Sequence, residues 1–279
     1  MAKYNKINWQ KGMEITPQVL INADNFQIEQ QNIIRRLQVM PCYGLLPESI
    51  FNADISTDGN MLSVSNLVIQ AVTPQGEIID INEQGKEPHR LDLNQYTRGS
   101  QFYVALNYND PVCPEKDTFF VTGEANQKTS AVVIAKISDN IVSLNYIPPC
   151  VFINSHHKLL EIFEGIRQKT ENIITQIKNQ DRYKSTFLPL SLLEFDLKNY
   201  SAFETPSDLF SIVKKFVSIF KLNITEIPEK TGILLNETYC HTEIYDRICL
   251  LLDSLCEIEE ITKAPVEGPK IQKIQIAVK

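Results

Sequence analysis

At Ile147-Pro148-Pro149 the pattern of the sequence changes, and this change limits the folds that the chain can adopt. From Phe51 to the prolines, short runs rich in β-branched and aromatic residues alternate with turn-forming residues, as in antiparallel sheets. After the prolines, apolar residues recur at the period of an amphipathic helix. Adjacent prolines donate no backbone hydrogen bonds, so a sheet ends here. The sequence therefore predicts the α+β class, with an antiparallel β-sandwich followed by an α-helical bundle.

Two turns in the first half predict β-hairpins. Asp58-Gly59 supplies the positive φ angles of a tight turn. Thr73-Pro74-Gln75-Gly76 places Pro and Gly where a turn favours them. About six to eight short strands without helical crossovers favour an antiparallel sandwich or barrel. The runs predicted as strands are Phe51–Ile55, Met61–Val64, Leu67–Val72, Glu77–Ile81, Leu91–Leu93, Phe102–Leu106, Ala131–Ile137 and Ile141–Tyr146.

Four amphipathic helices are predicted in the second half, and four such helices favour a bundle. The second helix has Pro189 in its first turn. The third begins with Thr205 as N-cap and Pro206 as its first residue, and the fourth runs from Glu237 to Ile261. The first and longest carries an apolar stripe that either fills its own bundle or packs about a threefold axis with copies of itself. The stripe residues are Leu159, Ile162, Phe163, Ile166, Ile173, Ile174 and Ile177.

These patterns divide the chain into four parts. We expect a partner-binding segment at 1–20, a β-sandwich domain at 21–150, a helical bundle at 151–262 and a tail at 263–279. The tail contains an apolar run, Ile271–Val278, that could form a strand but has no pairing partner nearby in the sequence. We expect it to be mobile or to be captured by another chain.

Charge and hydropathy exclude two classes of partner. The net charge is -7, and acidic and basic residues are interspersed, so no basic surface is expected to bind nucleic acid. No continuous apolar stretch is long enough for a signal peptide or a membrane span. We therefore expect a cytoplasmic protein that does not insert into a membrane. Six cysteines without a C-x-x-C pair indicate reduced thiols.

No motif of catalysis or cofactor binding is present. The sequence contains no dinucleotide or phosphate loop, no nucleophile elbow and no H-E-x-x-H. His156-His157 begins a helix, where adjacent side chains diverge, so a capping or surface role is favoured over a metal site. Cys240, His241 and Cys249 lack a fourth ligand at the usual spacing. We expect no catalytic residue, no metal and no cofactor, and therefore not an enzyme.

The N-terminal segment has the character of a binding peptide. Trp9, Met13 and the Pro17-Gln18 step lie in a stretch that is poorly able to bury itself, and such segments bind by placing apolar anchors in a partner's groove. The alternative is that Trp9 and Met13 cover their own sandwich.

The same segment resembles the opening of the TssK family of type VI secretion baseplate subunits. In that family a tryptophan, a Gly-Met or Gly-Leu pair and a Pro-Gln dipeptide have this spacing, here Trp9, Gly12-Met13 and Pro17-Gln18. Similar features follow in family order at Tyr43-Gly44, Thr73–Asp80 and Ile147-Pro148-Pro149. The departures are Lys11 where an acid is common, Val19-Leu20 in place of His-Phe, and the lack of a third domain after the helices.

The resemblance covers roughly residues 1 to 262 and implies a function. It implies a homotrimer whose N-terminal half is similar to the shoulder of phage receptor-binding proteins. It also implies that the N-terminal region, with Trp9, Gly12, Met13, Pro17 and Gln18, holds the wedge proteins TssF and TssG. The third domain of typical members contacts the membrane complex, so here we expect another anchor for a membrane-complex protein, with the tail as a candidate.

Two rival functions remain open from the sequence. A phage-like receptor-binding or glycan-binding protein would need exposed aromatic residues on loops, for which Tyr96, Tyr103 and Tyr108 are the candidates. An enzyme of unknown type would need polar groups that converge in a pocket.

Overall fold

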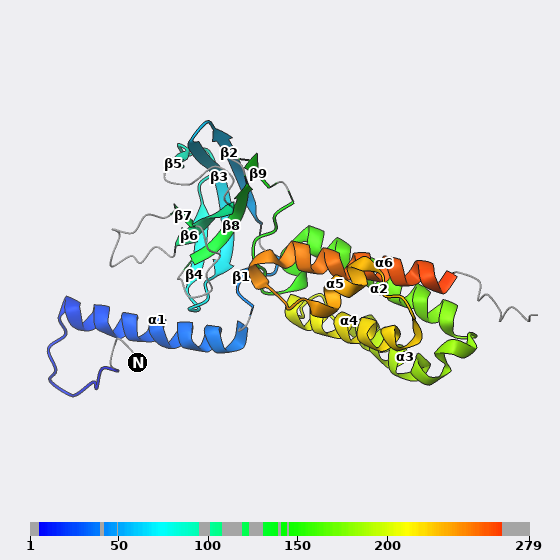
Figure 1. The fold of residues 1–279 in the computed structure, drawn as a ribbon. Coiled ribbons are helices and arrows are strands. Elements are labelled where there is room, and N and C mark those ends of the chain that lie inside the picture. The colour runs from blue at the N-terminus through cyan, green and yellow to red at the C-terminus, as the bar shows by residue number, and fades with distance from the viewer. Residues whose placement is uncertain are drawn as a thin grey trace, which may run out of the picture.

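The computed structural model describes residues 6–39, 42–48, 50–94, 101–107, 119–122, 131–138, 141–143 and 145–263. Along these residues a long N-terminal helix is followed by two antiparallel sheets and then by a group of helices (Figure 1). The α+β class and the order of its halves are therefore confirmed. The predicted strand at Ile271–Val278 lies outside the described residues.

The first sheet is organised around one long strand, β3 (Met61–Val72). β2 and β5 pair with its first half, and β1 and β4 pair with its second half. The second sheet has the order β7-β6-β8-β9. The other strands are β1 (Gly44–Leu45), β2 (Asn52–Asp58), β4 (Ile78–Asn82), β5 (His89–Asp92), β6 (Gln101–Asn107), β7 (Phe119–Thr122), β8 (Ala131–Ser138) and β9 (Ile141–Val142).

The predicted hairpins are confirmed, with one difference. Asp58 pairs with Met61 across Gly59-Asn60, and Val72 pairs with Ile78 across the second turn. The two runs predicted at 61–64 and 67–72 form the single strand β3, which continues through Asn66 although that residue has a φ of 50°. The Asn66 side chain donates to Asp54 at 2.7 Å, which holds this irregular position in place.

The bundle contains five α-helices among the described residues, where four were predicted. α2 packs against α3 and α6, α4 packs against α3 and α6, and α5 packs on α6. Apolar residues of both sheets and of the bundle form one continuous buried cluster. The helices are α2 (His157–Ile177), α3 (Lys184–Asn199), α4 (Pro206–Phe220), α5 (Glu229–Asn236) and α6 (Ile244–Lys263).

The start of α4 is as predicted, whereas the start of α3 is not. Thr205 caps α4 by accepting from the backbone N–H of Asp208 at 3.2 Å. Pro189, predicted in the first turn of α3, lies inside that helix. The helix begins earlier because Tyr183 is fully buried just before it and stacks on Phe220, with ring centroids 5.2 Å apart.

The predicted fourth helix is wrong at its N-terminal end. Glu237 lies outside any helix, and α6 begins only at Ile244. The residues just before Ile244 do not continue the helix, because His241 and Thr242 form hydrogen bonds with Tyr43 and Tyr146. The short α5 arises where the sequence favours no helix, because the Glu257 carboxylate of α6 accepts hydrogen bonds from the backbone N–H groups of Lys230 and Thr231.

Candidate functional site

The residues predicted to bind a partner lie on the surface. Trp9 is 53% exposed and Met13 is 37% exposed, so neither is sealed against the sheets as the alternative reading required. Gly12 lies between them with a φ of 87°, a conformation that glycine adopts without strain. The N–H of Met13 donates to the carbonyl of Gln10 at 3.1 Å, which closes this turn. Both apolar anchors are therefore available for contact.

Pro17 and Gln18 belong to a helix rather than to an extended peptide. Pro17 is the first residue of α1 (Pro17–Val39), a position where its missing N–H has no cost. The Thr16 hydroxyl accepts from the N–H of Val19 at 3.3 Å and caps the helix. The Gln18 side chain donates to Asn22 at 3.1 Å along the helix surface.

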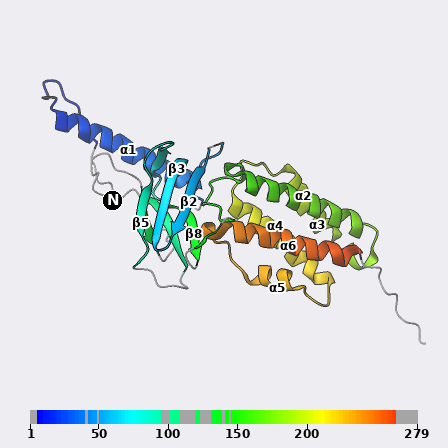
Figure 2. The same ribbon diagram turned by 90° about the horizontal axis from the view of Figure 1, so that it is seen from above.

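The helix α1 buries none of its described side chains. In Figure 1 it runs beneath the two sheets, and in Figure 2 its N-terminal part extends beyond them. An isolated helix of this kind is marginal in water, since most helical stability comes from packing an apolar face. Its exposed large apolar residues are Leu20, Ile21, Ile28, Ile34 and Leu37, with exposed fractions from 42% to 74%.

The exposed apolar residues of α1 are accompanied by few charged residues. Amide side chains separate its aliphatic residues, and its only charged residues are Asp24, Glu29, Arg35 and Arg36, which sum to zero. Depletion of charge around apolar residues characterises the central part of protein interfaces. The exposed residues of α1 were not predicted from the sequence, although aliphatic residues interleaved with amides were a signal that could have revealed them.

Behind α1, the chain enters a closely packed joint between sheet and bundle. The N–H of Leu45 donates to the carbonyl of Pro149 at 2.7 Å, and the N–H of Val151 donates to the carbonyl of Leu45 at 3.0 Å. Gly44 has a φ of 108°, and a Cβ there would lie 1.9 Å from the carbonyl oxygen of Pro149. Only glycine fits this contact. Tyr43-Gly44 and Pro148-Pro149, far apart in the sequence, thus meet in the fold.

His241 lies in the short turn just before α6 and contacts Tyr43 in the same joint. Its Nε2 lies 2.7 Å from the carbonyl oxygen of Tyr43, and its Nδ1 lies 2.7 Å from the hydroxyl of Tyr239. The backbone N–H of Tyr43 also lies 3.0 Å from Nε2. With its proton on Nε2 the ring donates to the Tyr43 carbonyl and accepts from Tyr239, and with its proton on Nδ1 it accepts from the Tyr43 N–H and donates to Tyr239. Burial lowers the pKa of His241 to about 4, because the charged ring would lose its hydration. The ring is therefore neutral near pH 7.

Further polar contacts connect the second sheet to the start of α6. The Tyr146 hydroxyl donates to the carbonyl of Thr242 at 3.1 Å. The Lys136 ammonium lies 3.6 Å from Glu243 and 3.8 Å from Asp246. Together with His241, these contacts account for the late start of α6. They also hold the second sheet against the start of α6.

The stripe predicted on the longest helix is covered by the chain itself. Ile162 and Ile174 are partly buried and pack on the core, and the other five residues of the stripe are fully buried between α2 and its neighbours α3 and α6. These buried residues are Leu159, Phe163, Ile166, Ile173 and Ile177. These five side chains therefore fill the bundle of their own chain.

The residues considered for other chemistry have structural partners. His156 caps α2, with its Nδ1 accepting from the N–H of Lys158 at 3.3 Å, as its position predicted. Both ring nitrogens of His241 are engaged, and the described residues contain no group of three potential metal ligands. Cys42 and Cys150 are buried free thiols, and Cys113 lies outside the described residues. Nothing in this set forms a catalytic arrangement.

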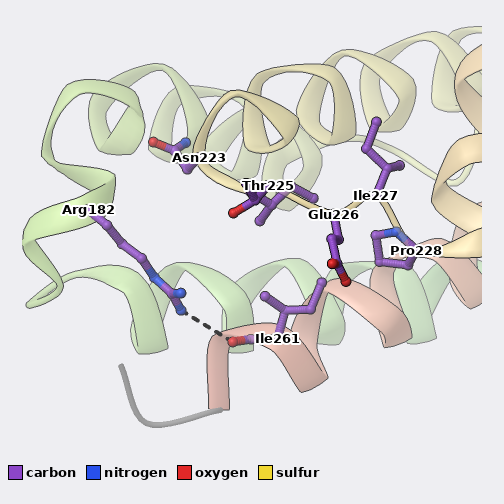
Figure 3. Close-up of a pocket in the computed structure, with 8 residues that line it drawn as sticks. Arg182, Asn223, Thr225, Glu226, Ile227, Pro228 and Ile261 are labelled. Atoms are coloured by element: carbon purple, nitrogen blue, oxygen red, sulfur yellow. Dashed lines mark hydrogen bonds between the residues drawn. The ribbon is translucent and has the colours of Figure 1, made fainter. Parts of the chain in front are cut away.

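The described surface gives little support to the two rival functions, a glycan-binding protein and an enzyme. Tyr103 is only 7% exposed, and Tyr96 and Tyr108 lie outside the described residues. A groove of about 680 Å³ lies at the end of the bundle, between residues 223–228 and the end of α6 (Figure 3). Its guanidinium, from Arg182, donates to the carbonyl of Ile261 at 3.2 Å. The other polar side chains of the lining are those of Asn223, Thr225 and Glu226. This groove does not bring a nucleophile and a base together.

No helix in the described part of the chain has the length and apolarity needed to cross a membrane. No protein-family model and no curated protein sequence matches the chain. Several solved structures match its fold. A chain of the type VI secretion TssK–TssF–TssG baseplate subcomplex matches with a TM-score of 0.64 and 12% identity, over 93% of this chain and 99% of that one.

Two structures of TssK itself have the same fold. A crystal structure of TssK matches with a TM-score of 0.62 and 13% identity, over 92% of this chain and 72% of that chain. TssK from EAEC, bound to a nanobody, matches with a TM-score of 0.57 and 13% identity, over 86% of this chain and 98% of that chain. The chain is therefore similar in fold to TssK, as its N-terminal motif indicated.

Proposed function

We propose that this chain is a structural, non-catalytic baseplate subunit of a type VI secretion system, acting in the cytoplasm as part of a phage-tail-like contractile injection machine. The observation that carries the proposal is the TssK-like fold over 93% of the chain, together with an N-terminal helix that buries none of its described side chains. A protein that acts by binding other proteins needs such a surface, whereas an enzyme needs a pocket with converging polar groups.

The partner of the N-terminal surface is the wedge formed by TssF and TssG. One matched chain belongs to a TssK–TssF–TssG subcomplex, which makes these proteins the natural candidates. Trp9 and Met13 act as anchors, and the turn at Gly12 lies between them in the segment that leads into Pro17 and Gln18. The apolar and amide side chains of α1 extend the contact. The proposed parts of the chain are the binding segment 1–20, the domain 21–150 and the bundle 151–262. The helix α1 crosses the boundary at residue 20 and belongs to the binding surface.

The subunit acts as a homotrimer that links the wedge to the membrane side. The link runs through the tail at 263–279, which contacts a membrane-complex protein. Two of the matched chains, of which this chain covers 72% and 70%, extend beyond the shared fold.

Co-purification with tagged TssF and TssG tests the proposal. The double variant Trp9→Ala, Met13→Ala should reduce binding about tenfold or more, because truncating apolar anchors commonly costs over 1 kcal/mol each. The matched control is Ile141→Ala, which removes an apolar side chain that is 70% exposed on the second sheet. Equal binding by the double variant, the control and the wild type would refute wedge binding at this surface.

A further inference from the structure

The groove at the end of the bundle has a lining that suits a peptide. One side is formed by residues 223–228, which lead from the turn after α4 to α5, and the other side includes Ile261 near the end of α6 (Figure 3). Ile224, Ile227 and Pro228 add apolar side chains to that of Ile261. Ile227 is 42% exposed, although it lies in a hollow of the surface. An apolar side chain in this position gains from contact with another apolar group.

Part of this lining has unpaired backbone groups. Residues 225–227 belong to no helix or strand, and their N–H and C=O groups form no hydrogen bond with any other described residue. Backbone groups that become covered need a hydrogen-bond partner, which water supplies while the groove is open. A peptide that lies along residues 225–227 replaces this water with its own backbone groups, as in the recognition of extended peptides by exposed edges.

The groove also offers a free carboxylate. Its lining contains one cation, Arg182, and one anion, Glu226. The Arg182 guanidinium is held by the chain itself, because it donates to the carbonyl of Ile261 at 3.2 Å and to the side chain of Gln180 at 3.1 Å. In the part of the chain that the structure describes, the exposed Glu226 carboxylate forms neither a hydrogen bond nor an ion pair. The groove therefore suits an apolar peptide that carries a cation near Glu226.

The chain supplies a peptide directly beside the groove. α6 ends at Lys263, two residues after Ile261, and residues 264–279 follow. These residues lie outside the described part of the chain, and their sequence allows them to turn back. Pro265 and Pro269 do not continue a helix, and Gly268 accepts the positive φ angles of a reversal in direction. A segment of this length extends over about 50 Å, so it can reach residues 225–227 from the end of α6.

The end of the tail has complementary side chains. Ile274, Ile276 and Val278 occupy alternate positions, so an extended backbone places all three on the same side. Three lysines follow the only acid of the tail, so this part of the chain is basic. The tail therefore combines the apolar face and the cation that the lining of the groove favours.

We infer that the groove binds the tail of the same chain, with Ile274, Ile276 and Val278 against its apolar side chains and a tail lysine beside Glu226. Because the tail is joined to α6, its concentration at the groove is roughly millimolar, so even a weak contact forms. The inference does not depend on the proposed function. It adds regulation to that function, since a membrane-complex protein that binds the tail must first displace it from the groove.

Amide hydrogen exchange in the full chain tests the inference. The double variant Ile274→Asp, Ile276→Asp should speed exchange at residues 225–227 about tenfold or more, because the tail no longer covers them. The matched control, Gln272→Asp with Gln275→Asp, adds the same charge at polar positions and should change the exchange less than about threefold. Circular dichroism should be unchanged in both variants, since the substituted residues follow α6 in the sequence. Equal exchange in the wild type and the isoleucine variant, or equally fast exchange in both variants, would overturn the inference.

A photo-crosslinking residue at position 227 identifies the occupant. The expected product is a crosslink within one chain to a peptide from 271–278, with a yield that does not change on dilution. The control at position 141, where Ile141 is 70% exposed on the second sheet, should give no such product. A crosslink between two chains would assign the groove to a second copy, and no crosslink to the tail would assign it to another ligand, so either result contradicts the inference. Neither result affects the test of wedge binding, which uses Trp9 and Met13.

Discussion

Replacing Gly44 by alanine should destabilise the protein far more than the same replacement at Gly59. Both glycines have positive φ angles, 108° and 59°. The difference is their surroundings, because a Cβ at Gly44 would lie 1.9 Å from the carbonyl oxygen of Pro149, whereas a Cβ at Gly59 would have nothing within 4 Å. The pair therefore separates the effect of backbone conformation from the effect of close approach.

The magnitude follows from three contributions at Gly44. A non-glycine residue held at such a φ costs about 1 to 3 kcal/mol. Real Cβ contacts under 3.0 Å are essentially never seen, so the chain around Pro149 must move by at least about 1 Å. That movement breaks the 2.7 Å hydrogen bond from Leu45 to Pro149 at a further cost of about 1 kcal/mol. We therefore expect a loss of about 2 to 4 kcal/mol for Gly44→Ala, to which the displacement around Pro149 adds, against about 1 kcal/mol for Gly59→Ala.

Urea unfolding followed by circular dichroism measures both losses. The free energy of unfolding is obtained by linear extrapolation for the wild type and for each variant. A large loss for Gly44→Ala with a small loss for Gly59→Ala would support the joint between sheet and bundle as a tightly packed element. Equal losses for the two variants would refute the argument from close approach, since backbone conformation would then account for the whole effect.

Three smaller effects are expected. Glu257→Ala should cost about 1 kcal/mol of unfolding free energy and increase amide exchange in α5, because its carboxylate caps that helix. Thr205→Ala should cost a similar amount, about 1 kcal/mol, through the loss of the cap on α4, and thermal melting can measure it. Burial places the pKa of His241 at about 4, below its ordinary value, so the unfolded chain takes up the proton first as the pH falls. Unfolding free energy should therefore decrease between about pH 6.5 and pH 4, by up to about 3 kcal/mol, and His241→Gln should show less of this decrease.

Features that depend on neighbours in the sequence could be predicted. The turn at Gly59 and the cap at Thr205 are set by a few adjacent residues, and both agree with the structure. The change of pattern at Pro148-Pro149 likewise located the transition from sheets to helices. The anchors Trp9 and Met13 were proposed from the poor self-burial of their segment, and both are exposed.

Features that depend on distant residues could not be predicted. α5 is capped by Glu257, which lies 26 residues after Thr231. The late start of α6 depends on the contact of His241 with Tyr43, 198 residues away. Periodicity also assigns each helix one buried face, so it could not show that α3 has a second apolar face left in solvent.

Trp9 gives the most direct test of partner binding at the N-terminal surface, because it is the only tryptophan in the chain. A chain labelled with fluorotryptophan should give one fluorine resonance that responds to exchange of H₂O for D₂O, since the side chain is 53% exposed. In a purified complex with TssF and TssG, this resonance should shift and lose its response to the solvent. A resonance that keeps the full solvent response in that complex would show that the partner does not cover Trp9.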